Sequence, residues 1–406
     1  GLRQSVQGPL DAAAVLAHRN YYTSDWHDDG AAQWLESIGA DLHRGHGRLT
    51  GPRTVTVTGS DGGQKVLTAR HAVAVCTGTD AVLPDLPGLA EVKPWTSRNA
   101  TSAQEVPGRL VVVGGGVVAT EMATAWQALG SQVTVLVRGK GLLNRMEPFA
   151  GELVAEALTE AGADVRTGTS VESVTRENGT VVVVTDQGDR IEADEILFAT
   201  GRRPKTGDIG LDTVGLEPGS WLPVDDSLRV TGTDWLYAVG DVNHRALLTH
   251  QGKYQARIAG AAIAARASGV PLLESDPWGA HAATADHHAV PQVVFTDPEA
   301  AAVGLSLAEA EQAGHRVRAV DVEMTSAAGA GLYADGYRGR ARMVVDLNEE
   351  ILRGVTFVGP GVGELIHSAT IAVAGQVPIS RLWHAVPSFP TISEVWLRLL
   401  EAYRDN

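Results

Sequence analysis

The chain has 406 residues, of which 44% are hydrophobic and 20% charged, and its formal net charge is −15. This composition excludes a disordered protein and predicts two or three domains with hydrophobic cores. The acidic balance argues against nucleic acid or an anionic membrane as a partner, and no apolar run reaches the roughly 18 residues of a membrane span. The single cysteine, Cys76, excludes a disulfide within this sequence. Together with the lack of a signal-like start, it favours the cytoplasm.

The first 88 residues are expected to form helices and then strands. Residues 1 to about 50 are predicted to be mostly helical, and the stretch TVTVTGSDGGQKVLTA is predicted to form a hairpin that turns at Ser60 to Gly63. The apolar strand HAVAVCTG then ends in Thr77-Gly78, with Cys76 as a small buried residue. The proline-rich stretch from Leu83 to Pro94 is expected to be a linker. Because the chain begins with Gly1 rather than Met, we expect that an N-terminal piece is missing.

The stretch LVVVGGGVVATE, residues 110–121, predicts a strand, a tight glycine turn and a helix, and the strand QVTVLV follows. In this interpretation Gly114 allows the turn, and Gly116 lets a pyrophosphate approach the backbone. Ala119 is small enough for the helix to pack on the strand. Phosphates would bind at the helix N-terminus, where free N–H groups and the helix dipole favour negative charge. A glycine turn without a ligand is the alternative.

The end of the second strand indicates which dinucleotide would bind. An NAD site usually has a carboxylate about 20 residues after the glycines, to hold the ribose 2′-hydroxyl. Here that position is followed by Arg138, Lys140 and Arg145, and no carboxylate occurs before Glu147. Basic side chains suit the 2′-phosphate of NADPH, so we predict NADPH rather than NADH. A solvated basic turn is the alternative.

Two more apolar strands end in glycine, namely LFATG, which ends at Gly201, and WLYAVGD, which ends in Gly240-Asp241. Ligands of parallel sheets bind beyond the carboxyl ends of the strands, where glycine admits a cofactor and aspartate accepts hydrogen bonds from hydroxyl groups. From about Val290 the pattern predicts strands and helices of a further domain. Histidines 281, 287 and 288 are interpreted as part of a solvated loop rather than as metal ligands.

In order along the chain, GxGxxA, ATGRRP, TDWLYAVGD, VVFTDPEAAAVGLS and FPTISE resemble the flavin-dependent pyridine nucleotide–disulfide oxidoreductases. Dihydrolipoamide dehydrogenase, glutathione reductase and mercuric reductase are members of that family. The resemblance implies an α/β protein with two Rossmann-like nucleotide-binding domains and a C-terminal α+β dimerisation domain. It implies a partial FAD domain over residues 1–88, an NAD(P)H domain over 89–204, a return to the FAD domain over 205–282 and an interface domain over 283–406.

The resemblance also implies roles for individual residues. Those assigned to FAD are Thr77, Gly78, Gly240, Asp241 and the helix-start segment Leu247, Leu248, Thr249 and His250. Gly201 matches a backbone contact to the nicotinamide nucleotide, and Glu121 matches an acidic residue near the nicotinamide. Glu394 matches the glutamate that orients the active-site histidine. A homodimer is expected.

The sequence departs from the family pattern in three ways. The first FAD glycine motif is absent before residue 50, and the redox pair CxxxxC is absent from this sequence, which a lost N-terminal piece would explain. The third departure has no such explanation, because Phe389 stands where the family has its histidine. Phenylalanine cannot transfer a proton, and general acid–base catalysis contributes roughly 10² to 10⁴ in rate. His384 lies five residues earlier and is expected to have a packing role.

Three functions stay open at this point. An NADPH-dependent FAD oxidoreductase that passes electrons to a small diffusible acceptor such as a quinone fits Phe389 best, because hydride transfer from NADPH needs geometry rather than a proton relay. A disulfide reductase of the dihydrolipoamide dehydrogenase type, with its cysteine pair in the missing piece, is the first alternative. A protein that binds NADPH without turnover is the second.

Overall fold

The computed structural model describes residues 10–273 and 276–405, so the helical prediction for residues 1–9 lies outside the described residues. Two compact units form. One comprises Ala81–Gly201 together with the chain from His288 onward, and we call it the nucleotide unit. The other comprises Ala13–Asp80 and Arg202–His287, and we call it the flavin-motif unit.

The elements of the flavin-motif unit, together with those that cross its borders, are α2 (Ala12–Tyr22), η1 (Ser24–Trp26), α3 (Asp29–Ser37), β1 (His46–Gly51), β2 (Thr54–Thr58), β3 (Gln64–Thr68), β4 (Val73–Val75), β5 (Thr79–Ala81), β13 (Arg202–Pro204), η2 (Leu211–Val214), β14 (Leu236–Ala238), η3 (Asp241–Asn243), α8 (Thr249–Ser268) and α9 (Ala285–His288). The early helices and the β2–β3 hairpin confirm the predicted pattern, and β2 and β3 pair antiparallel. Strands β4 and β14 pair in parallel, and the core beside them contains Leu211, Leu222 and Leu236.

The prediction that Cys76 is a buried strand residue is wrong. Strand β4 ends one residue earlier, at Val75, and the Cys76 side chain is exposed. Strand β4 belongs to a sheet of only two strands, and Ala74 in its middle is exposed as well. Strand β14 beside it is buried at all three residues, including Tyr237, the partner of Ala74. The exposure is therefore confined to the β4 edge of the sheet, where Ala74 and Cys76 lie at alternate positions.

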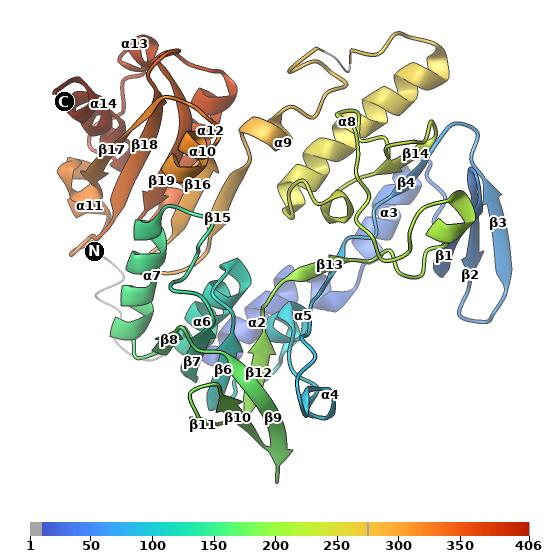
Figure 1. Ribbon diagram of the computed structural model, residues 1–406, viewed down its shortest axis with the longest axis horizontal. Coiled ribbons are helices and arrows are strands. Elements are labelled where there is room, and N and C mark those ends of the chain that lie inside the picture. Colours follow the sequence, from blue (N-terminus) through green and yellow to red (C-terminus); the bar gives the residue numbers. More distant parts are fainter. Residues whose placement is uncertain (1–9, 274–275, 406) are drawn as a thin grey trace. The chain divides into compact units, whose positions relative to one another are not determined.

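The first part of the nucleotide unit contains α4 (Leu89–Val92), α5 (Ser97–Ser102), β6 (Arg109–Val113), α6 (Val117–Ala128), β7 (Gln132–Val137), α7 (Pro148–Glu160), β8 (Asp164–Thr167), β9 (Val171–Glu177), β10 (Thr180–Thr185), β11 (Arg190–Ala193) and β12 (Glu195–Phe198). Four of the strands form a parallel sheet in the order β12-β6-β7-β8, and β11-β10-β9 form an antiparallel sheet (Figure 1). The strand–turn–helix–strand prediction is confirmed. The predicted linker is partly structured, because Leu89 and Val92 of α4 are buried in the core of this region.

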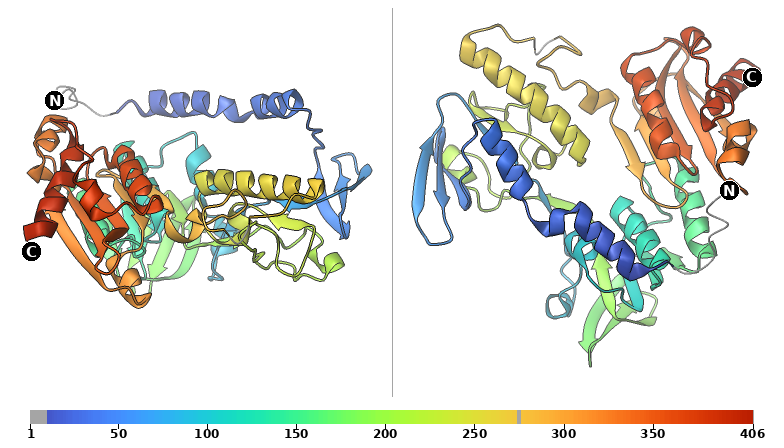
Figure 2. Two further views of the ribbon diagram at one scale, coloured as in Figure 1. Left: turned by 90° about the horizontal axis from the view of Figure 1, so that it is seen from above. Right: turned by 180° about the vertical axis from the view of Figure 1, so that it is seen from behind.

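The C-terminal part of the nucleotide unit contains β15 (Pro291–Val294), β16 (Ala300–Gly304), α10 (Leu307–Gln312), β17 (Val317–Glu323), η4 (Met324–Ser326), α11 (Ala328–Tyr333), β18 (Arg340–Asp346), β19 (Ile351–Val358), α12 (Val362–Ala374), α13 (Ile379–Leu382), η5 (Ile392–Glu394) and α14 (Val395–Asp405). The strands form one antiparallel sheet in the order β15-β16-β19-β18-β17. Helix α12 packs on β15, β16 and β19, and α14 packs on β17 and β18 (Figures 1 and 2). Strands β16 and β19 were not predicted from the sequence.

Candidate functional site

The first position of the turn between β6 and α6 has room only for glycine. Gly114 has a φ of +133°, and its N–H donates to the carbonyl of Leu136 at 2.9 Å. A Cβ at this position would lie 2.5 Å from the carbonyl oxygen of Ala199. Both the backbone conformation and the close approach of the neighbouring strand therefore require glycine.

Two residues later the same turn opens to solvent. Gly116 is the N-cap of α6 in an extended conformation, and a Cβ added there would meet no atom within 4 Å. Ala119, in the first turn of the helix, is fully buried and would lie 3.6 Å from a Cβ on Gly114. The first N–H groups of a helix have no partner within the helix. The turn thus combines close packing on one side with an open, positively polarised helix end on the other, which fits a pyrophosphate.

Basic side chains follow strand β7 as predicted. Arg138, Lys140 and Arg145 are exposed, and among the described residues none of them has a hydrogen bond or an ion pair. Glu147 is not available to a ribose, since it is buried, accepts from the N–H of Leu307 at 2.7 Å and pairs with Arg342 at 2.7 Å. The side-chain charges that directly follow strand β7 are therefore positive.

Glu121 lies on α6, one turn beyond the glycines, and is half-buried. Its carboxylate accepts a hydrogen bond from the N–H of Phe295 at 2.9 Å. Burial raises the pKa of Glu121 above its ordinary value, and the hydrogen bond from Phe295 opposes this shift. The predicted role beside the nicotinamide stays a prediction.

Gly201, the predicted nicotinamide nucleotide contact, also lies in the nucleotide unit. It has a φ of +144°, and its carbonyl accepts from the N–H of Val82 at 2.9 Å. The hydroxyl of Thr200 donates to the carbonyl of Val82 at 3.0 Å. The end of β12 is therefore fixed to a second segment of the same unit.

The residues assigned to FAD lie in the flavin-motif unit. Asp241 begins η3, which is separated from strand β14 by Val239 and Gly240, and its Oδ2 accepts from the hydroxyl of Thr79 at 2.7 Å. Arg202 donates to the same hydroxyl at 2.5 Å and lies 3.8 Å from Asp241 Oδ2. No donor among the described residues reaches the other oxygen of Asp241, Oδ1, which leaves it able to accept from a ligand hydroxyl. Thr79 and Arg202 were not predicted as site residues, although both directly follow predicted motif residues.

The other residues that are predicted to bind FAD lie after strand β4 and at the start of helix α8. Thr77 is exposed, and Gly78 has a φ of +69° with no atom within 4 Å of an added Cβ. Leu248 is the N-cap of α8, Leu247 is half-buried, and Thr249 and His250 form the exposed start of that helix. A Cβ on Gly252 of α8 would lie 3.5 Å from the Cα of Gly240, so helix and turn approach closely. These roles stay predictions.

The segment that replaces the family's HPTxxE lies in the nucleotide unit. Phe389 is 76% exposed, whereas Glu394 is only 6% exposed. Glu394 accepts from the N–H of Gly329 at 3.3 Å, and a Cβ on Gly329 would lie 2.0 Å from the carbonyl carbon of Thr391. Helix α11 therefore packs closely against this segment, and the Glu394 carboxylate binds the backbone N–H of Gly329. The nearby His384 is exposed.

The histidines at 281, 287 and 288 do not gather into a metal site. His281 accepts from the N–H of Leu273 at 3.0 Å, and His287 pairs with Asp226 at 2.8 Å. Within residues 10–273 and 276–405, no group of three or more metal-ligating side chains could hold an ion. None of the helices in those two ranges combines the length and the apolar character needed to span a bilayer.

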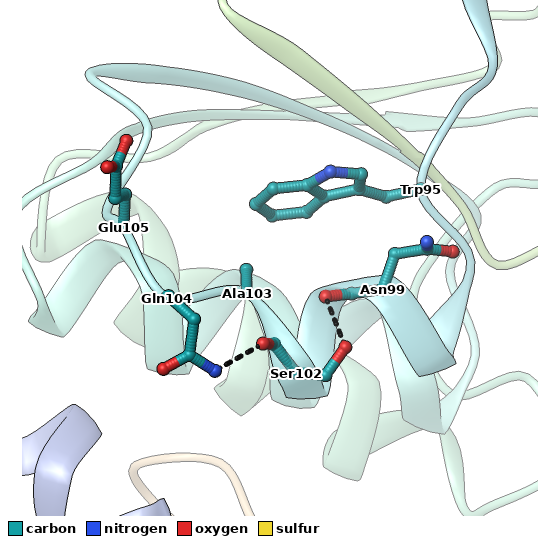
Figure 3. A pocket seen from close by; sticks show the side chains of 6 residues that line it. All are labelled: Trp95, Asn99, Ser102, Ala103, Gln104 and Glu105. Atoms are coloured by element: carbon teal, nitrogen blue, oxygen red, sulfur yellow. Dashed lines mark hydrogen bonds between the residues drawn. The ribbon is translucent and has the colours of Figure 1, made fainter.

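A surface pocket of about 400 Å³ lies elsewhere in the nucleotide unit, beside the β12 edge of the parallel sheet. Figure 3 shows its lining residues, Trp95, Asn99, Ser102, Ala103, Gln104 and Glu105. Asn99 accepts from the N–H of Thr96 at 3.0 Å, and Gln104 donates to the carbonyl of Ser102 at 2.7 Å. Its polar groups serve the local helix and turn, so we do not assign a ligand to it.

The parallel sheet with its glycine turn, the second glycine–aspartate turn and the separate antiparallel sheet define an α/β nucleotide-binding protein. Residues 30–268 match the family described as "Pyridine nucleotide-disulphide oxidoreductase". Residues 290–400 match "Pyridine nucleotide-disulphide oxidoreductase, dimerisation domain". The chain therefore belongs to this family, which confirms the predicted family and fold class. The enzymes of the family are flavin oxidoreductases that use FAD and NAD(P)H.

Individual relatives agree with this result. Mercuric reductase from Staphylococcus aureus is 30% identical over 396 residues, covering 96% of this chain and 68% of that protein. Dihydrolipoyl dehydrogenase from Thermus scotoductus is 32% identical, covering 92% of this chain and 77% of that protein. The crystal structure of LpdA from Mycobacterium tuberculosis superposes with a TM-score of 0.81 at 25% identity, covering 98% and 85%. The chain spans 60–68% of the length of the mercuric reductases that it matches.

Proposed function

We propose that the protein is an NADPH-dependent FAD oxidoreductase that reduces a small diffusible acceptor of the quinone class and acts as a homodimer. The observation that carries this proposal is the pairing of a complete nucleotide turn at Gly114–Gly116 with Phe389 in place of the family's proton-transferring histidine. The match of residues 290–400 to the family's dimerisation domain supports the homodimer.

The residues present offer a site for NADPH and part of a site for FAD. Gly116 leaves open space at the start of α6 for the pyrophosphate of NADPH, and the exposed Arg138 and Lys140 would hold its 2′-phosphate. In the flavin-motif unit, the free oxygen of Asp241 and the open backbone at Gly78 would hold FAD. When bound, FAD supplies an acceptor for a hydride and can release electrons to a second substrate.

The acceptor is inferred from what the C-terminal segment lacks. Reduction of a disulfide needs a residue that gives and takes protons at a thiolate, and Phe389 has no proton to transfer. Glu394 is buried, and its carboxylate accepts from the N–H of Gly329. The segment instead exposes apolar surface at Phe389 and at Val386, which is 82% exposed. In the proposed overall reaction, NADPH, a proton from water and a quinone give NADP⁺ and a hydroquinone. We include a cytoplasmic location, and the domain boundaries after residues 88, 204 and 282, in this proposal.

A second candidate is a disulfide reductase. The names of the relatives favour it, since they include dihydrolipoyl dehydrogenase and glutathione reductase. This function would require a cysteine pair outside the present sequence, whose single cysteine is Cys76, and a proton-transferring group other than Phe389.

The experiment that separates the candidates measures NADPH oxidation by the FAD-loaded protein under anaerobic conditions. A water-soluble 1,4-benzoquinone, lipoamide and glutathione disulfide are compared as acceptors, with NADH in place of NADPH as a control. We expect turnover with the quinone at least a hundredfold faster than with either disulfide. Equal or faster turnover with a disulfide would overturn the proposal in favour of the reductase. Binding of NADPH without oxidation in any mixture would indicate a nucleotide-binding module.

A further inference from the structure

Behind the Gly240–Asp241 turn, the flavin-motif unit buries a cluster of polar side chains. Gln251 and Gln255 lie one turn apart on the inner face of α8, and both are buried together with Asn243 and Asp286. Burying polar groups costs free energy unless each finds a hydrogen-bond partner. Since the rest of the inner face of α8 carries alanines at 259, 262 and 265, polar residues here need a specific explanation.

Gln255 connects the turn to the cluster. Its Oε1 accepts two hydrogen bonds, from the N–H of Gly240 and from Nδ2 of Asn243, both at 2.8 Å. Its Nε2 donates to Asp286 Oδ2 at 2.9 Å, and Gln251 donates to Asp286 Oδ1 at 2.8 Å. A carboxylate accepts but does not donate, so Asp286 fixes which end of the Gln255 amide faces Gly240.

The turn itself needs this support. Gly240 has a φ of 79° and a ψ of −154°, a conformation that side chains rarely adopt, and its N–H is the donor that Gln255 accepts. The next residue is Asp241, whose carboxylate accepts a hydrogen bond from the hydroxyl of Thr79. Asn243 closes the same turn by donating to the carbonyl of Ala238 at 3.0 Å. The direction of the Asp241 carboxylate is therefore set by hydrogen bonds on both sides.

We propose that Gln255 and Asp286 are positioning residues for FAD, which hold the Gly240–Asp241 turn in the orientation that binds the cofactor. This inference rests on the proposed binding of FAD at Asp241. An apolar pair of equal volume could fill the same space, but it could not direct the N–H of Gly240. Neither residue is assigned contact with FAD, so their effect would reach the cofactor only through the turn.

The test exchanges the amide and the carboxylate. In Gln255→Glu, two carboxylates face each other, and one of them must turn away or take up a proton. Combining Gln255→Glu with Asp286→Asn restores the acceptors of Gly240, Asn243 and Gln251, because the new amide can donate to the new carboxylate and still accept from Gln251. The carboxylate stays within the cluster, although the 3.7 Å ion pair between Asp286 and Arg245 is lost. Gln251→Glu is the matched control, since it places the same charge beside Asp286 on the same helix but does not contact Gly240.

FAD dissociation constants and thermal midpoints are measured for all four proteins. We expect Gln255→Glu to weaken FAD binding at least tenfold. We expect Gln251→Glu, at a similar loss of thermal stability, to stay within threefold of the wild type, and the double variant to return to within threefold. Equal losses in the two single variants, or a double variant that folds or binds FAD poorly, would overturn the proposal. If Gln255→Glu does not fold, the double variant alone decides.

These outcomes separate the inference from the proposed function. Wild-type protein that binds no FAD would refute the proposed function before any variant is made. Wild-type protein that binds FAD but does not oxidise NADPH with a quinone would refute the function while leaving the positioning test intact. Normal FAD binding by all variants would refute only the positioning role.

Discussion

Within the nucleotide unit, the glycine turn after β6 and the segment from Phe389 to Glu394 differ in what they retain. The turn has each feature that a pyrophosphate needs, from the constrained Gly114 to the open Gly116. The C-terminal segment keeps its glutamate but directs it into the protein, where it accepts from Gly329, and it presents an exposed phenylalanine in place of a base. The turn therefore keeps the family's glycine pattern, whereas the C-terminal segment departs from it at Phe389.

The largest expected effect would disturb the turn itself. Gly114→Ala forces a methyl group to within 2.5 Å of the Ala199 carbonyl oxygen at a positive φ, so we expect a loss of at least about 3 kcal/mol in the free energy of unfolding. Gly116→Ala is the matched variant, because its methyl group meets only open space. We expect it to unfold like the wild type but to raise the KM for NADPH about tenfold or more. Chemical denaturation and steady-state kinetics measure the two effects. Equal stability losses would mean that Gly116 has a packing role.

Substitution of the basic residues after β7 is expected to have a smaller effect, again on the binding of NADPH beside the glycine turn. Arg138→Ala should raise the KM for NADPH about tenfold, the size of one charge-assisted hydrogen bond to the 2′-phosphate. The KM for NADH should change less than twofold, because NADH has no phosphate there. Lys140→Ala should act in the same direction. A parallel rise of both KM values would refute the assignment of these side chains to the 2′-phosphate.

Restoring the histidine tests the other side of the comparison. Phe389→His should change the rate with a quinone by less than threefold, since the proposed reaction uses no proton-transferring group at this position. Val386→His, three residues away and also exposed, controls for the introduction of an imidazole. Rates with the quinone and with lipoamide are compared from pH 6 to 8. A gain of a hundredfold or more with lipoamide in Phe389→His alone would favour the disulfide reductase, because that is the size of general acid–base catalysis.

Local sequence patterns predicted the local parts of this structure. The β6–α6–β7 unit and the β2–β3 hairpin follow from apolar periodicity and glycine placement within about 30 residues. What could not be predicted depends on distant partners. Gln255 meets Gly240 across the turn and Asp286 from another segment, and Glu147 pairs with Arg342, 195 residues later. The exposure of Cys76 escapes prediction for the same reason, because burial at a strand end depends on which other elements cover it.

The smallest expected effect concerns Glu121, beside the turn. Burial raises its pKa in the folded chain above the ordinary value of 4.5. The unfolded chain therefore releases this proton at a lower pH than the folded chain does. The stability contributed by the protonated carboxyl is present below about pH 4.5 and is lost as pH rises through the raised pKa.

Glu121→Gln removes the loss of folding stability at high pH, because the amide stays neutral and its Oε1 can still accept from the N–H of Phe295. We expect the variant to gain less than about 1 kcal/mol over the wild type at pH 8 and nothing at pH 4. Thermal unfolding at the two pH values measures the difference, with Glu311→Gln, at an exposed position, as the control. A variant that loses stability at pH 8 would mean that the ionised carboxylate is held by more than the Phe295 hydrogen bond. Glu121 would then resemble Asp241, whose carboxylate accepts from a side-chain hydroxyl, rather than Glu394, which is buried and accepts from a backbone N–H.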